Sequence, residues 1–224
     1  MNRTPILIAV VAFAGSAFAH GDVAPQAVNT EKLPDVGEEW LTENPYRDDP
    51  EVFHAAIDIG ASGYNSNCAR CHGLGAISGG LAPDLRFLEA EEYGDEWFME
   101  RFQHGYTQNG VTKMPAFGEL LGQKAAWAIR SYVETRPDDA QVTDASPQLK
   151  DVRDRLAGWS QSGEAGDVEA TKSELMEIAG GIETLSGSPL ADSIALRAAQ
   201  SLEQDPTNLA GAAEILTIGL SAAN

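Results

Sequence analysis

The sequence predicts an all-α protein in which a first helical domain is followed by a small helical bundle. Apolar residues recur at helical spacing on both sides of the stretch that carries the two cysteines. Beyond residue 147 the chain is rich in Ala and Leu, contains no Cys or His and has one aromatic residue, Trp159. Residues 136–148 ("RPDDAQVTDASPQ") have the composition of a linker between these regions. A chain of 224 residues is long enough for two such domains.

The first 19 residues are typical of an export signal. Arg3 supplies a short positive region, residues 6–14 are apolar, and "AFA" precedes His20 as a cleavage site. The apolar run is too short to span a bilayer, and no later stretch approaches about 18 apolar residues. We expect cleavage between Ala19 and His20 and a mature periplasmic protein that does not span the membrane. A retained N-terminal anchor is the alternative.

Residues 20–50 predict an extended arm, because Pro and Gly interrupt every candidate helix. Trp40 and Tyr46 are isolated aromatic residues that would fix the arm across an apolar surface, and a mobile arm is the alternative. A helix is predicted from Asp49, which suits an N-cap, with Pro50 at the first helical position. We expect its apolar stripe to consist of Val52, Ala55, Ala56 and Ile59.

Two further helices are predicted in the first domain, which spans residues 51–138. Residues 96–103 carry apolar residues at helical spacing and end before Gly105, a plausible stop. Residues 123–136 form the next predicted helix, which ends before a proline. Between the two, residues 106–122 are predicted to be a loop, because Asn-Gly and Met-Pro interrupt regular structure there.

The second domain, residues 139–224, is predicted to contain about four helices in a small bundle. Apolar residues step by four along two of its segments: Leu190, Ile194, Ala198, Leu202 and Ala212, Leu216, Leu220. Helix breaks are expected at residues 163–166, at Gly187 and at residues 205–206. No motif in this region indicates a role.

The formal net charge of −19 excludes one class of function. No basic patch is present that could bind nucleic acid, and the overall acidity would repel phosphate groups. The acidic residues are spread over both domains, so they indicate no single docking face. They suit either the electrostatic steering of a basic partner or solubility alone.

Both cysteines lie in "NCARCHGLGAISGG", residues 67–80. Three alternatives to covalent haem attachment are a disulfide between Cys68 and Cys71, a redox dithiol and a zinc site. A redox dithiol belongs in a β-α-β context without a His after the second Cys, and a zinc site needs two further ligands. The pattern C-x-x-C-H is typical of haem c attachment, in which Cys68 and Cys71 form thioethers and His72 is the proximal iron ligand. We therefore predict one covalently bound haem c.

A sixth iron ligand is predicted at Met114, in an irregular loop and followed by a rigid proline. His104, close to the same loop, is the rival nitrogen ligand. The other methionines and histidines are not expected to bind the iron. We place Met99 in the core, Met176 in the second domain, His54 on a partly exposed helix face and His20 at the mature N-terminus.

The segments "GASGYNSNCARCHGLGA", "GGLAPDLR" and "KMPAFGELLGQKAAWAIRSYV", in this order, resemble a class I cytochrome c. The resemblance implies that the last helix crosses the first at Gly60 through an aromatic residue, either Trp127 or Tyr132. It implies that the carbonyl group of Pro83 accepts a hydrogen bond from the proximal imidazole. It also implies that Met114 is the distal ligand. Arg86 would neutralise a haem propionate, with an exposed surface arginine as the alternative.

Residues 20–138 more narrowly resemble cytochrome c-550 of the PedF type, which accepts electrons from pyrroloquinoline-quinone (PQQ) alcohol dehydrogenases. The resemblance implies a periplasmic single-electron carrier between such a dehydrogenase and a downstream cytochrome or terminal oxidase, and not an enzyme. The alternatives are a haem enzyme or small-ligand sensor with a labile sixth site, and an adaptor whose C-terminal helices tether the cytochrome to a partner.

Overall fold

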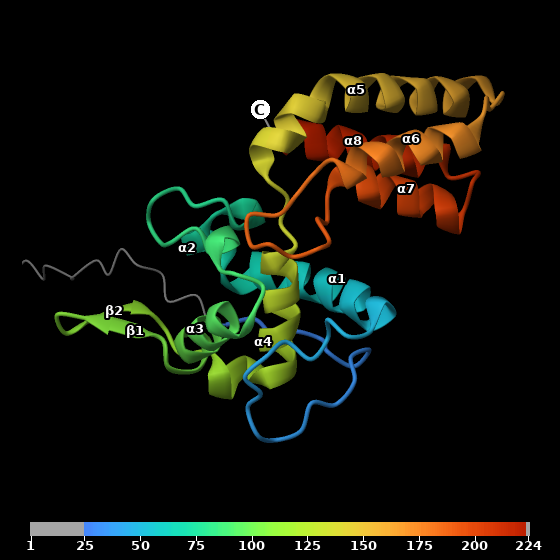
Figure 1. Ribbon diagram of the computed structural model, residues 1–224. Coiled ribbons are helices and arrows are strands. Elements are labelled where there is room, and N and C mark those ends of the chain that lie inside the picture. Colours follow the sequence, from blue (N-terminus) through green and yellow to red (C-terminus); the bar gives the residue numbers. More distant parts are fainter. Residues whose placement is uncertain (1–24, 223–224) are drawn as a thin grey trace, which may run out of the picture.

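The computed structural model describes residues 25–222, which form two helical lobes (Figure 1). The N-terminal lobe, residues 25–138, contains α1 (Pro50–Asn67), α2 (Ala69–His72), α3 (Glu92–His104), β1 (Tyr106–Gln108), β2 (Val111–Met114) and α4 (Gly118–Glu134). The C-terminal lobe, residues 139–222, contains α5 (Asp139–Ser162), α6 (Val168–Gly180), α7 (Ile194–Gln204) and α8 (Leu209–Ala222). The predicted all-α class is confirmed, with one short hairpin added.

Among residues 25–222, no helix has the length and apolar character needed to cross a membrane. The expected export signal, residues 1–19, and His20 lie outside the described residues.

Asp49 caps α1, as its position before Pro50 predicts. Its Oδ1 atom accepts hydrogen bonds from the backbone N–H groups of Glu51 (2.9 Å) and Val52 (3.2 Å), which a helix start would otherwise leave unpaired. The predicted apolar stripe is displaced, because only Ala56 of its four members is fully buried. The buried face of α1 consists of Phe53, Ala56, Ile57, Gly60, Gly63 and Tyr64. Two of these buried residues are glycines, and the prediction missed them because it counted only apolar side chains.

Helices α1 and α4 cross with their backbones in contact at Gly60. A Cβ atom at Gly60 would lie 1.9 Å from the carbonyl oxygen of Ala128, so only glycine fits there. The expected crossing of α4 over α1 at Gly60 is present, but the point of contact is the backbone of Ala128 and not a ring of Trp127 or Tyr132. Trp127 is fully buried beside the crossing, and the Tyr132 ring lies 5.2 Å from the Tyr64 ring, one turn further along both helices. The absence of a side chain, and not an aromatic ring, brings the two helices together.

Residues 25–49, before α1, contain turns and bends but no helix or strand, and they pack onto the N-terminal lobe. Tyr46 is fully buried, and Trp40 lies 6.5 Å from Phe102 between ring centroids. The Leu41 N–H group donates a 2.6 Å hydrogen bond to Oε1 of Gln123, at the start of the straight part of α4. The two aromatic residues thus fix the arm as expected, and the mobile-arm alternative is wrong.

Four charged side chains form a buried network where the arm meets α3 and α4. Arg47 of the arm pairs with Asp95 of α3 (2.7 Å) and with Glu134 of α4 (2.6 Å). Arg130 of α4 donates a 2.7 Å hydrogen bond from Nε to Asp95. The side chains of Asp95, Arg130 and Glu134 are fully buried, so each charge requires an internal partner. Two positive and two negative groups supply that balance and join three segments of the chain.

Residues 106–114 form a β-hairpin, so the prediction of a loop is wrong there. Strands β1 and β2 pair antiparallel around Asn109 and Gly110, whose φ angles are 51° and 75°. Asn-Gly is the preferred pair for a two-residue hairpin turn with positive φ at both positions. The turn signal was present in the sequence, but the strands have only three and four residues and carry no clear alternation.

The predicted linker is also wrong, because α5 begins at Asp139 and continues through Pro147. Asp138 caps this helix by accepting a 2.9 Å hydrogen bond from the N–H group of Ala140. Pro147 lies on the exposed side of α5, where a displaced backbone carbonyl remains solvated. Only three residues, Arg136, Pro137 and Asp138, therefore separate α4 and its C-cap Thr135 from α5.

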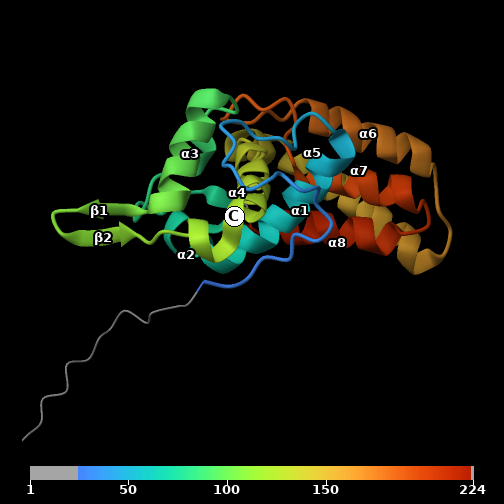
Figure 2. The same cartoon turned by 90° about the horizontal axis from the view of Figure 1, so that it is seen from below.

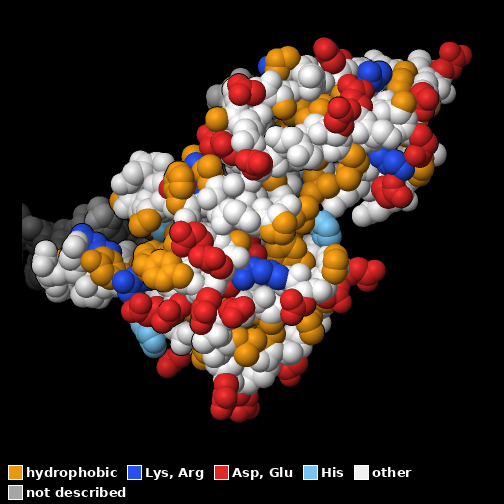
Figure 3. Space-filling view, viewed as in Figure 1, with side chains coloured by type: hydrophobic (Ala, Val, Ile, Leu, Met, Phe, Trp, Pro, Cys, Tyr) orange, Lys and Arg blue, Asp and Glu red, His pale blue; other side chains and the backbone are white. Residues whose placement is uncertain are grey.

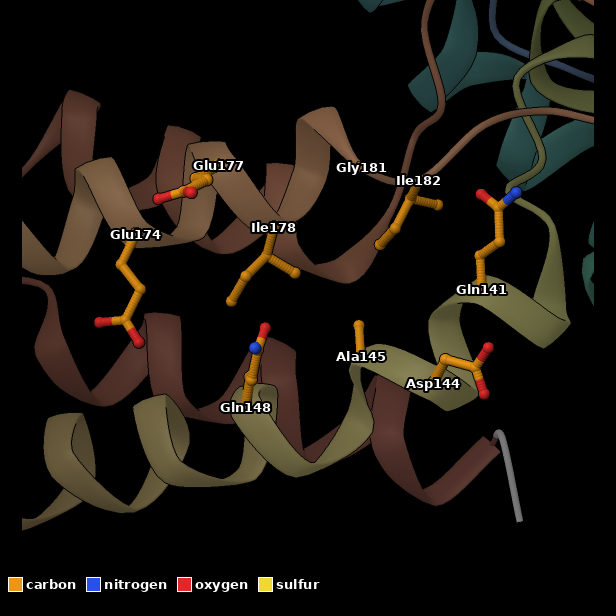
Figure 4. A pocket seen from close by; sticks show the side chains of 9 residues that line it. All are labelled: Gln141, Asp144, Ala145, Gln148, Glu174, Glu177, Ile178, Gly181 and Ile182. Atoms are coloured by element: carbon orange, nitrogen blue, oxygen red, sulfur yellow. The ribbon is translucent and has the colours of Figure 1, made fainter.

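The C-terminal lobe has a core of its own, built from α5, α6, α7 and α8. Leu149, Leu156, Leu175, Leu202 and Leu216 are fully buried in it. On one side, α5 and α6 diverge around a groove of about 530 Å³ (Figure 4). Its apolar residues, Ala145, Ile178 and Ile182, lie among acidic and amide side chains from both helices. The groove contains none of the predicted site residues.

Residues 181–193 connect the lobes by lying along the end of α4. Asp192 donates a 2.8 Å backbone hydrogen bond to Thr135, and its carboxylate pairs with Arg136 and with Arg197 (2.6 Å). Glu183 accepts a 2.8 Å backbone hydrogen bond from Asp138. The two lobes are therefore joined by hydrogen bonds and a buried ion pair in addition to the covalent connection.

The Gly60→Ala substitution should destabilise the protein by about 3 kcal/mol, because the new methyl group would separate α1 from α4. Gly158→Ala is the matched control: Gly158 lies within α5 and a Cβ there meets nothing within 4 Å. The control should be neutral or stabilising by up to about 1 kcal/mol. Urea unfolding of the full chain measures both, and equal effects of the two substitutions would contradict the role of the crossing.

Acid should weaken the connection between the lobes. Burial alone would raise the pKa of Asp192, but Arg136 and Arg197 outweigh it and hold that pKa below its usual value. A carboxyl group with a lowered native pKa stabilises the fold above its unfolded pKa, and this contribution is lost as the pH falls below about 4. Asp192→Asn should lower the free energy of unfolding by about 3 kcal/mol at pH 7. It should also make this free energy depend less steeply on pH between about pH 5 and 2. Exposed Asp144→Asn is the control, and an unchanged acid slope in D192N would refute the assignment.

Candidate functional site

The two cysteines and His72 lie on a single helical turn at the end of α1. The backbone N–H groups of Cys71 (3.1 Å) and His72 (3.0 Å) both donate to the carbonyl oxygen of Cys68. This is the turn that the C-x-x-C-H spacing predicts. Gly73 follows with a φ of 84°, and a Cβ atom there would lie 1.9 Å from the carbonyl oxygen of Ile77. The chain can therefore reverse after His72 only because residue 73 is glycine.

The cysteines are not joined in a disulfide. Burial raises the pKa of Cys68 to about 12, and the neighbouring Cys71 adds to the effect. Redox-active thiols have the opposite property, a lowered pKa. Within residues 25–222, no group of three or more His, Cys, Asp or Glu side chains is arranged to hold a metal ion, so the pair has no partners for a zinc site there. The geometry favours a covalent anchor.

The imidazole ring of His72 is buried, and a hydrogen bond of its Nδ1 atom orients it. Nδ1 lies 2.9 Å from the carbonyl oxygen of Pro83, which can only accept a hydrogen bond, so Nδ1 carries the proton. In the neutral ring this tautomer leaves the electron pair that a metal requires on the second nitrogen, Nε2. Tyr64 supports the same turn, because its hydroxyl group donates a 2.9 Å hydrogen bond to Gly73. The contact that the resemblance implied for Pro83 is present.

Arg86 is buried, so the alternative of an exposed surface arginine is wrong. Its guanidinium group donates to both carboxylate oxygens of Asp84 (3.0 and 2.8 Å) and to Asp139 (2.5 Å). The hydrogen bonds that Arg86 donates to Asp84 raise the pKa of Arg86 further, with burial opposing this effect and Asp139 adding to it. Burial raises the pKa of Asp84, but its hydrogen bonds from Arg86 outweigh this and lower it. Two carboxylates of the chain already neutralise Arg86, and its contact with a haem propionate stays a prediction.

Met114 is the last residue of β2 and is partly buried against the core of the N-terminal lobe, as is Cys68. Its backbone is tightly held. A Cβ atom at Gly105 would lie 2.4 Å from the Met114 carbonyl oxygen, and Phe117 donates a 2.8 Å backbone hydrogen bond to Phe102. The end of α3 and the start of α4 therefore fix residue 114 from both sides. A side chain on such a support suits a ligand whose sulfur must not move.

The donor set fits a covalently attached haem. It combines two free thiols, an imidazole ring oriented through its Nδ1 atom and a thioether on a rigid support. Leu74, Ile77 and Leu81 follow His72 closely and are exposed by 76%, 44% and 77%, an apolar surface that a macrocycle would cover.

Comparison with known proteins agrees with this geometry. The family model described as cytochrome c oxidase, cbb3-type, subunit III matches residues 55–133, which include all the site residues predicted from the sequence. Cytochrome c550 of Pseudomonas aeruginosa is 49% identical over 140 residues, which cover 60% of this chain and 97% of the relative. The chain belongs to the c-type cytochromes. It is an electron-transfer protein that carries covalently bound haem c.

Two further relatives of this c-type cytochrome are larger proteins. Quinohemoprotein alcohol dehydrogenase ADH-IIG of Pseudomonas putida is 34% identical over 85 residues, which cover 38% of this chain and 11% of the dehydrogenase. The cbb3-type cytochrome c oxidase subunit FixP of Rhizobium meliloti is 30% identical over 123 residues, covering 49% of this chain and 38% of that subunit. No solved structure matches the cytochrome significantly.

The other methionines and histidines considered as iron ligands differ from Met114 in how far they are buried. Met99 is 3% exposed and packs in the core, as predicted, and Met176 is 49% exposed on α6 in the other lobe. His104 is exposed at the end of α3, and His54 is half-buried on α1. Two features of the cytochrome were missed by sequence reasoning: the pairing of Arg86 with Asp139, and the buried network around Asp95. Both join residues far apart in the chain, and no local signal indicates them.

Met114→Ala should convert the haem iron from low-spin to high-spin and allow carbon monoxide to bind rapidly to the reduced protein, because the sixth position would be open. His104→Ala is the control and should leave the visible spectrum unchanged. A low-spin spectrum that persists in M114A but is lost in H104A would transfer the ligand role to His104. Absorption spectra of both oxidation states measure this.

Proposed function

We propose that Cys68 and Cys71 form the thioether bonds to the haem and that His72 and Met114 are its axial ligands. The observation that carries this assignment is the hydrogen bond between His72 Nδ1 and the carbonyl oxygen of Pro83, on a helical turn with two free thiols. It fixes the tautomer and orientation of the ring and increases the basicity of Nε2. When bound, haem c supplies a one-electron Fe(III)/Fe(II) couple, and a His/Met ligand pair raises its potential.

The proposed role is to carry single electrons from a PQQ-dependent alcohol dehydrogenase to a downstream cytochrome or terminal oxidase. Two similarities support it. A segment equal to 11% of a quinohemoprotein alcohol dehydrogenase resembles this chain, and so does a part of a cbb3-type oxidase subunit. Segments similar to this cytochrome thus occur in an alcohol dehydrogenase, the proposed class of electron donor, and in an oxidase subunit, the proposed class of acceptor. A separate cytochrome would connect two such enzymes by diffusion.

Diffusion between partners requires export to the compartment where they meet. We propose a periplasmic location, supported by the signal-like residues 1–19 and by the relationship to cytochrome c550. The formal charge of −19 would steer the protein toward basic surfaces. Figure 3 shows acidic side chains over both lobes of the face it displays, so the attraction would be of long range and not confined to one patch.

Anaerobic mixing of the ferric protein with a purified PQQ-dependent alcohol dehydrogenase and its alcohol tests the donor. The haem should be reduced rapidly, and the rate should fall about tenfold as the ionic strength is raised from 10 mM to 0.5 M, because salt screens the steering. The same mixture without alcohol is the control. A reduction rate that equals the control would refute the donor assignment, and it would leave the haem ligands unaffected.

A further inference from the structure

The hydrogen-bond acceptor of the proximal histidine lies in a loop that the C-terminal lobe holds. Pro83 begins the segment 83–91, which runs from the His72 contact to the start of α3. Proline has no N–H group of its own to fix its backbone by donation. The position of its carbonyl oxygen therefore depends on the residues on either side.

At the first end of the segment, one ion cluster connects Pro83 to α5. The adjacent Asp84 accepts hydrogen bonds from Arg86 through the backbone N–H group (3.1 Å), Nε (3.0 Å) and Nη2 (2.8 Å). Arg86 in turn donates from Nη1 to Oδ1 of Asp139, the first residue of α5, over 2.5 Å. The Arg86 side chain is 7% exposed and that of Asp84 19%, so their contact is largely shielded from water and salt. The Asp139 side chain is 56% exposed, and it reaches the buried guanidinium group from the solvent side.

At the second end, the C-terminal lobe again provides the contact. Ala90 donates a 2.9 Å backbone hydrogen bond to Ser186, and the Ser186 hydroxyl group donates a 2.5 Å hydrogen bond to Glu134 at the end of α4. Segment 83–91 is thus fixed at both ends by residues that follow residue 138. A lobe that merely accompanied the cytochrome would not need to contact this segment twice.

We propose that Asp139 is a positioning residue for the haem: through Arg86 and Asp84 it holds the Pro83 carbonyl group against His72, and thereby sets the reduction potential. The proposal rests on His72 being the axial ligand. A well-aligned hydrogen bond from Nδ1 increases the electron density on the imidazole ring. An electron-rich ligand stabilises Fe(III) more than Fe(II), so it lowers the potential. Loosening the Pro83 carbonyl group should have the opposite effect.

Asp139→Ala should therefore raise the midpoint potential, which a redox titration with mediators measures without any partner protein. We expect the equilibrium to shift three- to tenfold toward Fe(II), where tenfold corresponds to about 59 mV for one electron. Exchange of the His72 Nδ1 proton with solvent, followed by NMR, should become several-fold faster. Asp139→Asn keeps an oxygen that can accept from Arg86 and should shift the potential less. Asp139→Glu should restore most of the wild-type value.

Asp144→Ala is the matched control, since it removes one exposed carboxylate from the same helix without touching Arg86. The proposal is overturned if D139A and D144A shift the potential equally, or if D139N shifts it as far as D139A, because charge alone would then explain the effect. It is also overturned if D139A lowers the unfolding temperature but leaves the potential and the Nδ1–H exchange unchanged. Failure of the axial assignment would appear separately, as a wild-type spectrum that is not low-spin.

Discussion

The backbone contact between α1 and α4 at Gly60 is the constraint on which the N-terminal lobe depends. It is short because there is no side chain at residue 60, and the Ala128 carbonyl oxygen occupies the space where a Cβ atom would be. The crossing fixes the direction of α1, and α1 ends in the turn that presents Cys68, Cys71 and His72. Any separation of the two helices would displace this turn, the proposed haem anchor, together with the core.

A second constraint is electrostatic and joins segments that the crossing does not reach. The buried network around Asp95 holds the arm, α3 and α4 with two positive and two negative side chains. Such a network adds little stability relative to apolar packing, but removal of one member leaves a buried charge unpaired. It therefore selects one arrangement of the arm and makes partial displacement costly. The network meets α3 near its start, at Asp95, and the other end of this helix supports Met114 through Gly105.

The sequence predicted the features that short stretches determine. The cap at Asp49, the end of α3 at Gly105 and the C-x-x-C-H turn each depend on a few adjacent residues, and each is present. The hairpin was missed because its strands are too short to show alternation, and α5 was missed because its Pro147 is on the solvent side. The partners of Arg86 could not be predicted, since Asp139 is 53 residues away and the ion pair arises only when the lobes pack.

The placement of the C-terminal lobe resolves two opposing demands on an electron carrier. Rigid ligands favour an enclosed haem, whereas transfer to a partner requires that one side stay accessible. The C-terminal lobe contacts the cytochrome through segment 83–91 and the end of α4, on the side of Pro83. The hairpin that carries Met114 lies on the other side of the N-terminal lobe, away from α5–α8, in both Figure 1 and Figure 2. With His72 and Met114 as the proposed ligands, the added lobe would stiffen the His72 side of the haem and leave the hairpin side open to a partner.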